Sequence, residues 1–369
     1  MEEARKWIKL AEKSGTFAFD VETDNIDEMR AKPVGFSISV SVGEGCYIPL
    51  IAGGTRMLPE IELKEALRPL LEDESLRLIG HNFKYDYKVL SRWGVQTRNL
   101  HFDTMVAAWL IDTTASTYGM DNLAEKWMGY RPIAYKEVVP KGSPFSDVEL
   151  QTAADYAAED ADVTLRFYEL FAPRLSEVEQ ERLFYEMEMP LVPILAEMEL
   201  RGISIVSERL HEYSLELEEE LEEIKGRIYE ECGREFNINS TRQLQKILFE
   251  ERKLKPIKKT KTGYSTDVSV LEELAKEDVV PELVLRHRSL SKLKSTYVDT
   301  LPELVHPETG RIHTRLLQTG TATGRLSSRD PNLQNIPIRE QAGRRIRRAF
   351  VPEEGKLLIS ADYSQIELV

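Results

Sequence analysis

The chain has few cysteines and no long apolar run. Its 369 residues include only two cysteines, Cys46 and Cys232, which lie far apart and show no metal-ligand spacing. This scarcity excludes a disulfide-built scaffold and suits the cytoplasm, where thiols stay reduced. The N-terminus shows no signal-peptide pattern, and no stretch reaches the roughly 20 apolar residues needed to span a bilayer. We therefore expect a cytoplasmic protein with no membrane partner.

A basic excess is also missing. The net charge of −14 argues against a protein coated in nucleic acid, although it does not exclude local basic surfaces. Hydrophobic residues make up 41% and charged residues 30% of the chain, which is typical of a globular protein. A chain of this length is too long for one typical core, so we expect two or three domains.

Residues 17–23, Phe-Ala-Phe-Asp-Val-Glu-Thr, form the stretch around which the rest is organised. A short apolar run predicts a buried strand, and its carboxylates Asp20 and Glu22 are two apart, so both project from one face. Two like charges on a buried strand repel each other and lose hydration. A pair of divalent cations would compensate them. The alternative is a solvated edge strand with two surface acids.

The first part of the chain alternates helices and strands. The pattern predicts helices near 2–13 and 62–71 and strands near 16–20, 36–42, 45–50 and 76–79. In the second of these strands, apolar residues alternate with serines, which indicates a half-buried strand. Strands joined by a tight turn and followed by helices predict a mixed sheet flanked by helices, an α/β fold.

Two further pairs of polar residues follow at helical spacing. Asn82 and Asp86, and then Tyr156 and Asp160, are each four apart, so each pair shares a face if its segment is helical. Three alanines keep the second helix slim enough to lie close to a sheet: Ala153, Ala157 and Ala161. Each pair alone could be an ordinary helix surface. Combined with the acidic strand, they provide the four carboxylates and one tyrosine of a two-metal phosphodiesterase.

This set of residues suits hydrolysis of a phosphodiester. Two cations about 3.5–4 Å apart screen the anionic substrate, generate the nucleophile and stabilise the leaving oxygen. Carboxylate oxygens favour Mg²⁺ or Mn²⁺, so we expect two such ions. A tyrosine hydroxyl can hydrogen-bond the attacking water. The sequence shows no histidine or cysteine ligand set of the kind that favours zinc.

These three motifs resemble those of the DNA-proofreading exonuclease superfamily, whose fold is ribonuclease-H-like. The sequence from Tyr156 to Thr164 is similar to the 3′→5′ exonuclease domain of the bacterial DNA polymerase I family. The resemblance implies that the metals are held by Asp20, Glu22, Asp86 and Asp160, and that Tyr156 orients the attacking water. It also implies that the terminal nucleotide is gripped or wedged by Thr23, Ile26, Asn82 and Tyr135.

The second part of the chain is mainly helical. The pattern predicts helices over 176–201 and 207–232, with Ser207 as N-cap, and another helix capped by Ser240. Residues 252–263 then hold six basic residues and no acid, in a segment rich in Pro, Gly and Thr. An exposed cationic loop of this kind suits contact with phosphates without sequence readout. The alternative is a loop that is merely soluble.

Later segments resemble the same polymerase family. Residues 237–245 and 258–266 are similar to its thumb, and 318–328 and 330–337 match it almost letter for letter. The resemblance implies contacts of the loop lysines with the primer–template duplex: Lys258, Lys259 and Lys261. It further implies that Arg325, Gln334 and Asn335 touch the minor-groove edge, where acceptors common to all base pairs report pairing geometry.

The last residues resemble the start of the family's palm. An apolar strand ending in Asp362 is expected there, with Asp362 as a ligand of the polymerase metals and Glu367 screening ribose 2′-hydroxyls. Val369 stands where the family usually has arginine, and the fingers helix and second palm acid are missing from this sequence. Since nucleotidyl transfer needs two metals held by at least two separated carboxylates, Asp362 alone leaves us to expect an incomplete polymerase site. A fragment, a broken reading frame and one half of a split polymerase with a second polypeptide all fit.

The sequence therefore predicts three regions. Residues 1–175 form a 3′→5′ exonuclease domain, 176–305 form connecting helices and a mainly α-helical thumb, and 306–369 begin an α+β palm. The leading hypothesis is a metal-dependent DNA exonuclease on the N-terminal part of a family A DNA polymerase, bound to single-stranded 3′ ends and primer–template duplex. The alternatives are a related 3′→5′ ribonuclease and a non-catalytic, DNA-holding half of a split polymerase.

Overall fold

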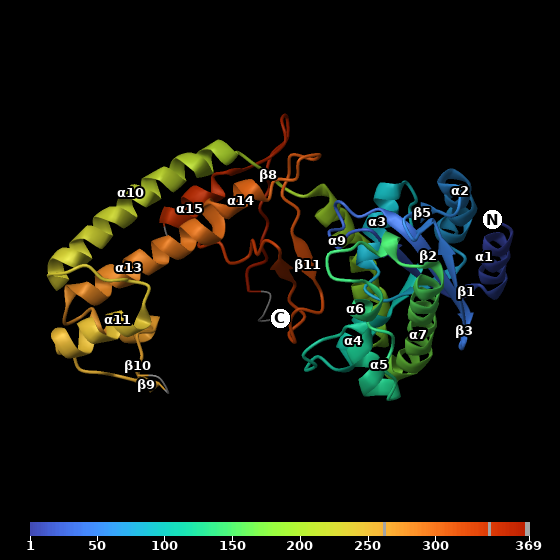
Figure 1. Cartoon of the computed structure of the whole chain (residues 1–369), viewed down its shortest axis with the longest axis horizontal. Coiled ribbons are helices and arrows are strands. Elements are labelled where there is room, and N and C mark those ends of the chain that lie inside the picture. Colours follow the sequence, from blue (N-terminus) through green and yellow to red (C-terminus); the bar gives the residue numbers. More distant parts are fainter. Residues whose placement is uncertain (261–262, 339–340, 366–369) are drawn as a thin grey trace. The chain divides into compact units, whose positions relative to one another are not determined.

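The computed structural model describes residues 1–260, 263–338 and 341–365 and divides into two compact units (Figure 1). The first unit contains Met1–Arg201 and Arg315–Arg329, and the second contains Gly202–Thr314 and Asp330–Val369. These units end at other residues than the expected boundaries at 175 and 305, which stay predictions. A segment from late in the sequence, residues 315–329, belongs to the N-terminal unit.

A five-stranded sheet organises the first unit, in the order β3-β2-β1-β6-β7. The strands are β1 (Thr16–Thr23), β2 (Pro33–Ser41), β3 (Glu44–Pro49), β6 (Arg77–Gly80) and β7 (Leu100–Asp103). Strand β1 is central, antiparallel to β2 and parallel to β6. The expected mixed sheet is confirmed. The sequence pattern missed β7.

The two faces of β1 explain why its acids lie where they do. Phe17, Phe19 and Val21 are buried with the residues of α1 (Glu2–Ser14), α2 (Glu60–Glu72) and α3 (Lys84–Trp93). Ala18 points the other way, toward the helices that cover the opposite face. Asp20 and Glu22 have the same parity as Ala18, so they leave the strand on that side.

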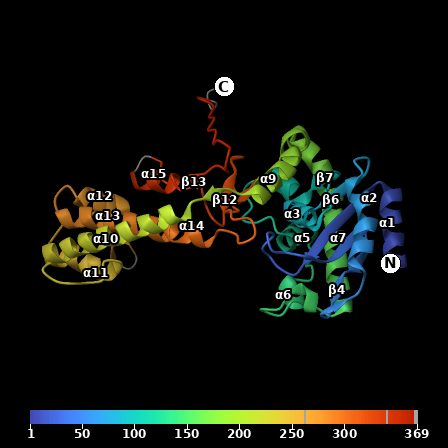
Figure 2. The ribbon, with the colours of Figure 1, turned by 90° about the horizontal axis from the view of Figure 1, so that it is seen from above.

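The helix α7 (Leu150–Glu177) covers this second face and lies along β1, β2 and β3 (Figures 1 and 2). Its three alanines are buried, as expected for a slim helix: Ala153, Ala157 and Ala161. At Gly45 a Cβ atom would lie 2.5 Å from the carbonyl oxygen of Ala158, so only glycine allows this approach. Alanine and glycine together bring the helix close enough for its polar side chains to meet those of β1.

This close approach corrects one expectation. Strand β2 was predicted to be half-buried, with its serines in solvent, but Ser37 and Ser39 are fully buried. The reason is that α7 covers the serine face of the strand. Ser39 Oγ donates to the carbonyl oxygen of Glu44 at 2.7 Å, which satisfies its hydroxyl within the sheet.

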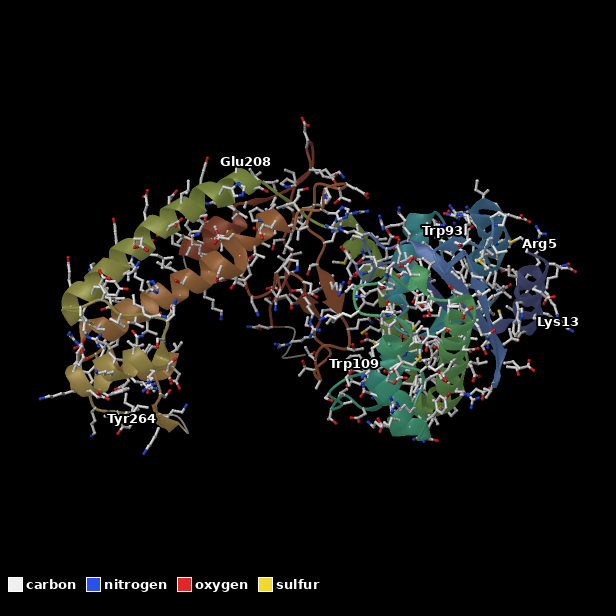
Figure 3. All side chains as sticks on the ribbon, viewed as in Figure 1. Arg5, Lys13, Trp93, Trp109, Glu208 and Tyr264 are labelled. Atoms are coloured by element: carbon white, nitrogen blue, oxygen red, sulfur yellow. The ribbon has the colours of Figure 1, made fainter. Side chains whose placement is uncertain are left out.

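The rest of the first unit surrounds this sheet. Its further helices include α4 (Thr104–Ile111), α5 (Met120–Met128), α6 (Tyr135–Val138), α8 (Glu181–Leu183), the π-helical turn Phe184–Glu188 and α9 (Met189–Arg201), and its short strands include β4 (Ile51–Ala52) and β5 (Thr55–Arg56). Strands β11 (Arg315–Leu317) and β12 (Ser327–Arg329) form a hairpin. Trp109 on α4, labelled in Figure 3, donates from Nε1 to the carbonyl oxygen of Thr321 at 3.0 Å and so fixes the hairpin loop.

The second unit is built on two long helices, α10 (Ser207–Cys232) and α13 (Val279–Leu293), which pack along each other. Between them in sequence lie α11 (Thr241–Gln245), the π-helical segment Lys246–Glu251, the strands β9 (Lys259–Thr260) and β10 (Gly263–Tyr264), and α12 (Val268–Leu274). Ser240 caps α11 as expected. Ser207 does not cap α10, because the extended residue before the helix is Val206 and Ser207 is already helical.

The later residues of this unit add α14 (Thr300–Glu303), α15 (Gln341–Arg347), and a small sheet of β8 (Ser204–Ile205) with β13 (Phe350–Val351). The apolar strand expected to end at Asp362 is not formed, and Leu357 and Ile359 are 87% and 90% exposed. A strand needs a neighbouring backbone for its hydrogen bonds, and no described segment pairs with residues 357–362. None of the described helices is long and apolar enough to cross a membrane.

Candidate metal centre and nucleotide-end site

Four carboxylates from one strand and two helices meet beside β1. Asp20 and Glu22 on β1 and Asp160 on α7 each offer a carboxylate oxygen within 4.8 Å of the others. Asp86, in the first turn of α3, is only 3% exposed, and its charge acts on Glu22 and interacts with that of Asp20. The structure thus brings together all four acids that the sequence singled out. We call these four residues the acid cluster.

Burial and mutual repulsion hold protons on this cluster. Loss of hydration raises the pKa of Asp20 to about 6. The pKa of Glu22 lies well above its usual value, first because of burial and then because of the charges of Asp20 and Asp160. Burial likewise raises the pKa of Asp86 and of Asp160, with Asp20 adding to both. Throughout the described ranges, no lysine or arginine forms an ion pair with any of the four acids.

The cluster fits a divalent cation. One oxygen of Glu22, Oε1, is buried and has no hydrogen-bond partner in the described part of the chain. A buried acceptor without a donor costs free energy, and here it lies among other anionic oxygens. Hard oxygen ligands with no nitrogen or sulfur among them are the set that Mg²⁺ and Mn²⁺ prefer. The residues therefore suit such ions chemically.

Tyr156 lies one helical turn before Asp160 on α7 and hydrogen-bonds to its carboxylate. Burial, followed by the charges of Asp160 and Glu22, raises the pKa of Tyr156. The phenol therefore keeps its proton and can act as a donor. Tyr135 on α6 contacts Tyr156 edge-to-face, with 6.3 Å between ring centroids, and is 45% exposed. The structure thus brings Tyr135 to the same site.

The end of β1 and the segment after it carry two of the expected residues. Thr23 Oγ1 donates to the carbonyl oxygen of Asn25 at 3.0 Å and lies 2.6 Å from the hydroxyl of Tyr85. The same Tyr85 hydroxyl donates to that carbonyl oxygen at 2.6 Å. Ile26 is 79% exposed, so a large apolar side chain stands in solvent close in sequence to the acids. The sequence did not indicate Tyr85, which fixes the backbone beside Thr23.

Asn82 differs from the expectation. It was predicted to share a helical face with Asp86, but α3 begins at Lys84, and Asn82 precedes it with a φ of 55°. The cause is Asp103, which accepts hydrogen bonds from the backbone N–H groups of Asn82 at 3.2 Å and Phe83 at 2.8 Å. Asp103 also caps α4. Its position just before an apolar run is an N-cap signal that could have revealed it.

A second charged group was missed altogether. Lys88 on α3 donates from Nζ to Glu28 Oε1 at 2.5 Å and also to Glu199 Oε2 on α9. Arg315 of β11 binds both oxygens of Glu28, at 3.1 and 2.9 Å, and Lys84 Nζ lies 2.5 Å from Glu199 Oε1. We call these five residues the ionic cluster. Its members are up to 287 positions apart, so no local pattern announces it.

The expected DNA-contact residues are distributed over both units. Lys258 is 62% exposed and pairs with Asp267 at 3.1 Å, and Lys259 lies on β9, whose neighbour β10 carries Tyr264 (Figure 3). Arg325 lies in the β11–β12 loop of the first unit, whereas Gln334 and Asn335 belong to the second. Both of their backbone N–H groups donate to Asn332 Oδ1.

Three expected contacts have a different outcome. Lys261 and Glu367 lie outside the described residues. Asp362 is exposed, and in the ranges that the structure describes it joins no group of three or more candidate metal ligands. Its role in a polymerase metal site stays a prediction.

Comparison with known proteins decides the family. A family profile described as 3′-5′ exonuclease matches residues 1–176, and one described as DNA polymerase family A matches residues 207–369. DNA polymerase I of Pseudomonas aeruginosa is 43% identical over 98% of this chain. The chain belongs to the bacterial DNA polymerase I family. The DNA polymerase I of Geobacillus stearothermophilus is 44% identical over 95% of the chain. The chain spans 41% of the length of each of these two relatives.

A solved structure of the same family agrees. It is described as the POL domain of Pol1 from M. smegmatis in complex with DNA primer-template and dNTP. It shares 32% sequence identity and a TM-score of 0.84 with this chain, covering 99% of this chain and 60% of its own. The resemblance to DNA polymerase I, made from the motifs alone, is therefore confirmed.

Proposed function

We propose that the first unit is a divalent-metal-dependent 3′→5′ DNA exonuclease that trims the primer strand. The observation that carries this proposal is the acid cluster: three buried carboxylates and the half-buried Asp20, without counter-charge, beside a protonated tyrosine. Bound ions would screen the phosphodiester, activate a water and stabilise the leaving 3′ oxygen. Side chains of the first unit would hold these ions and position the water and the end of the DNA strand.

Each side chain then has a definite task. The acids Asp20, Glu22, Asp86 and Asp160 would hold the cations. Tyr156 donates its hydroxyl proton to Asp160, so its hydroxyl oxygen would accept a hydrogen bond from the attacking water and orient it. Ile26 and Tyr135 offer exposed apolar surfaces to the terminal base, and Thr23 and Asn82 would grip the terminal nucleotide.

We further propose that the second unit comprises the thumb and the start of the palm and holds primer–template DNA. The support is the exposed lysines around β9 and β10, together with the DNA-bound relative. The four acids and Tyr156 all lie in the first unit, so exonuclease activity is the activity to test on this chain.

The decisive experiment incubates the purified chain with 3′-labelled single-stranded DNA in Mg²⁺ and in EDTA. We expect release of mononucleotides only with the metal, and faster trimming of frayed ends than of matched ends. A matched end must first unpair, which costs a few kcal/mol. The control is Asp160→Asn. Preference for RNA would favour the ribonuclease alternative, and DNA binding without trimming would favour a purely DNA-holding role.

A further inference from the structure

The ionic cluster lies on the same helix as one of the metal-site acids. Asp86 and Lys88 are two residues apart on α3, so they leave the helix in different directions. Asp86 takes part in the acid cluster, while Lys88, only 2% exposed, lies between two carboxylates. One short helix therefore connects the two groups of buried charges.

The carboxylate of Glu28 links the ionic cluster to Ile26, one of the residues expected to contact the terminal nucleotide. Glu28 belongs to the segment 24–32, which joins β1 to β2 and carries the exposed Ile26. Its side chain is 7% exposed and is held from one side by Lys88 and from the other by Arg315. Arg92, one turn after Lys88, donates to the carbonyl oxygens of Glu28 and Ala31. The segment is thus fastened to α3 through both side chain and backbone.

Glu199 is the second carboxylate that binds Lys88. It accepts from Lys84 and Lys88 on α3 and from the backbone N–H of Leu316 at 2.7 Å. The carbonyl oxygen of Leu316 in turn accepts from Lys84. The cluster therefore joins α3, α9, the β11–β12 hairpin and segment 24–32 within the first unit.

We propose that Lys88 is a positioning residue of the exonuclease site, acting through Glu28 to set segment 24–32 and its Ile26 at the end of the DNA strand. This inference rests on the proposed function. Lys88 does not touch the acids that hold the metal, so its effect falls on the grip of the terminal nucleotide. Glu28 and Glu199 both contact Lys88 Nζ. When Lys88 is removed, these two carboxylates repel each other, and Glu28 draws segment 24–32 away from α3.

The proposal predicts a separation of kinetic constants. Removing a grip made equally in the bound and reacting states raises KM and leaves kcat unchanged. For Lys88→Met we expect KM for 3′-labelled single-stranded DNA to rise about 10-fold, which corresponds to about 1.4 kcal/mol of lost binding. We expect kcat to change less than about 2-fold. Binding of the same DNA in Ca²⁺, followed by fluorescence anisotropy, should weaken by the same factor as KM rises.

Three variants complete the test. Arg315→Met removes the second partner of Glu28 but keeps Lys88, so it should raise KM less and remain folded because Arg315 is 40% exposed. Lys88→Arg keeps the charge and should restore much of the affinity. The control is Lys126→Met, which breaks an exposed pair with Asp112 in the same unit and should change neither constant.

The outcomes separate the two proposals. Unchanged KM and DNA affinity in folded Lys88→Met would overturn the positioning role, as would a fall in kcat alone, which would trace the effect to Asp86. If Lys88→Met does not fold, an unchanged KM in Arg315→Met overturns it. If the wild-type chain binds DNA but trims none, the exonuclease proposal fails, while the anisotropy series still decides the role of Lys88.

Discussion

The acid cluster and the ionic cluster differ in whether neighbouring cations compensate the charges of their carboxylates. In the ionic cluster, Glu28 and Glu199 share Lys88, and each has a further cationic partner. Burial on its own would raise the pKa of Glu28, but Lys88 and then Arg315 bring it below its usual value. In the acid cluster, burial and neighbouring acids act in the same direction, and the pKa of Glu22 rises.

The difference shows where the chain provides its own cations and where it leaves room for others. Both clusters carry the cost of removing carboxylates from water. In one, lysine and arginine side chains offset that cost in the folded protein. In the other, the described residues offer a hydroxyl and backbone N–H groups, and a compensating charge must come from solution. A buried acid is therefore informative about function only after its partners have been examined.

The largest expected effect breaks the acid cluster. Asp160→Asn removes a ligand oxygen and its charge while keeping the shape of the side chain. We expect DNA trimming to fall by more than about 100-fold, since even outer partners of metal ligands cost about 10–100-fold when removed. Without metal the variant should melt at a higher temperature than the wild type, because one repelling charge is gone. Trimming at the wild-type rate would refute the metal-site assignment.

The same change in the ionic cluster should have the opposite sign. Glu199→Gln also neutralises a buried acid, but it leaves Lys84 and Lys88 with one carboxylate fewer. Breaking a buried ion pair from one side typically lowers the free energy of unfolding by about 3–5 kcal/mol. Denaturant unfolding in EDTA should therefore show Asp160→Asn stabilised and Glu199→Gln destabilised. If both variants shift the same way, the contrast between the two clusters is wrong.

The pH dependence sharpens this contrast. The pKa of Asp20 rises from 3.8 to about 6 on folding, so between these values the folded state binds more protons than the unfolded state. Stability from this group is therefore present at low pH and lost as pH rises through about 6. In EDTA, Asp20→Asn should exceed the wild type in Tm by a margin that grows between about pH 4 and pH 7. Saturating Mg²⁺ should raise the Tm appreciably only for the wild type. A difference in Tm between the two proteins that stays constant with pH in EDTA would contradict this account.

The smallest expected effect is that of exposed lysines in the second unit on duplex binding. Lys255, Lys258 and Lys259 are exposed in the basic segment of the second unit. Changing all three to alanine should weaken duplex binding and reduce the slope of log K against log salt by roughly 0.9 for each phosphate that the lysines no longer neutralise. Trimming of short single strands should stay unchanged, because the acids lie in the other unit. An equal loss of both activities would contradict the separation of the two sites.

Local patterns predicted the parts of the fold that local forces decide. The helix at 207–232 and the strand around residues 16–23 follow from periodicity. Asp20 and Glu22 follow from their spacing along that strand, and Tyr156 follows from its spacing to Asp160 on α7. Asn82 broke the pattern because Asp103, 21 positions away, captures its backbone N–H and holds the chain outside the helix. A hydrogen bond from a distant strand outweighed the helical spacing.

Long-range structure was beyond the reach of spacing. The buried serines of β2 depend on how closely α7 approaches, which Gly45 permits from another strand. The ionic cluster draws on segments from residue 28 to residue 315, each of which looks like an ordinary charged surface. The expected strand before Asp362 has the right composition, but a strand also requires a neighbour, which composition cannot supply.

The late hairpin of the first unit has a consequence for the order of events at the ribosome. Residues 315–329 complete a unit whose other residues end at Arg201. At about 5–20 residues per second, roughly 6–25 s of synthesis separate residue 201 from residue 329. During that interval Glu28 has emerged without Arg315, and α4 has emerged without the loop that Trp109 binds. The nascent first unit therefore lacks Arg315, a cationic partner of Glu28, until most of the second unit has been translated.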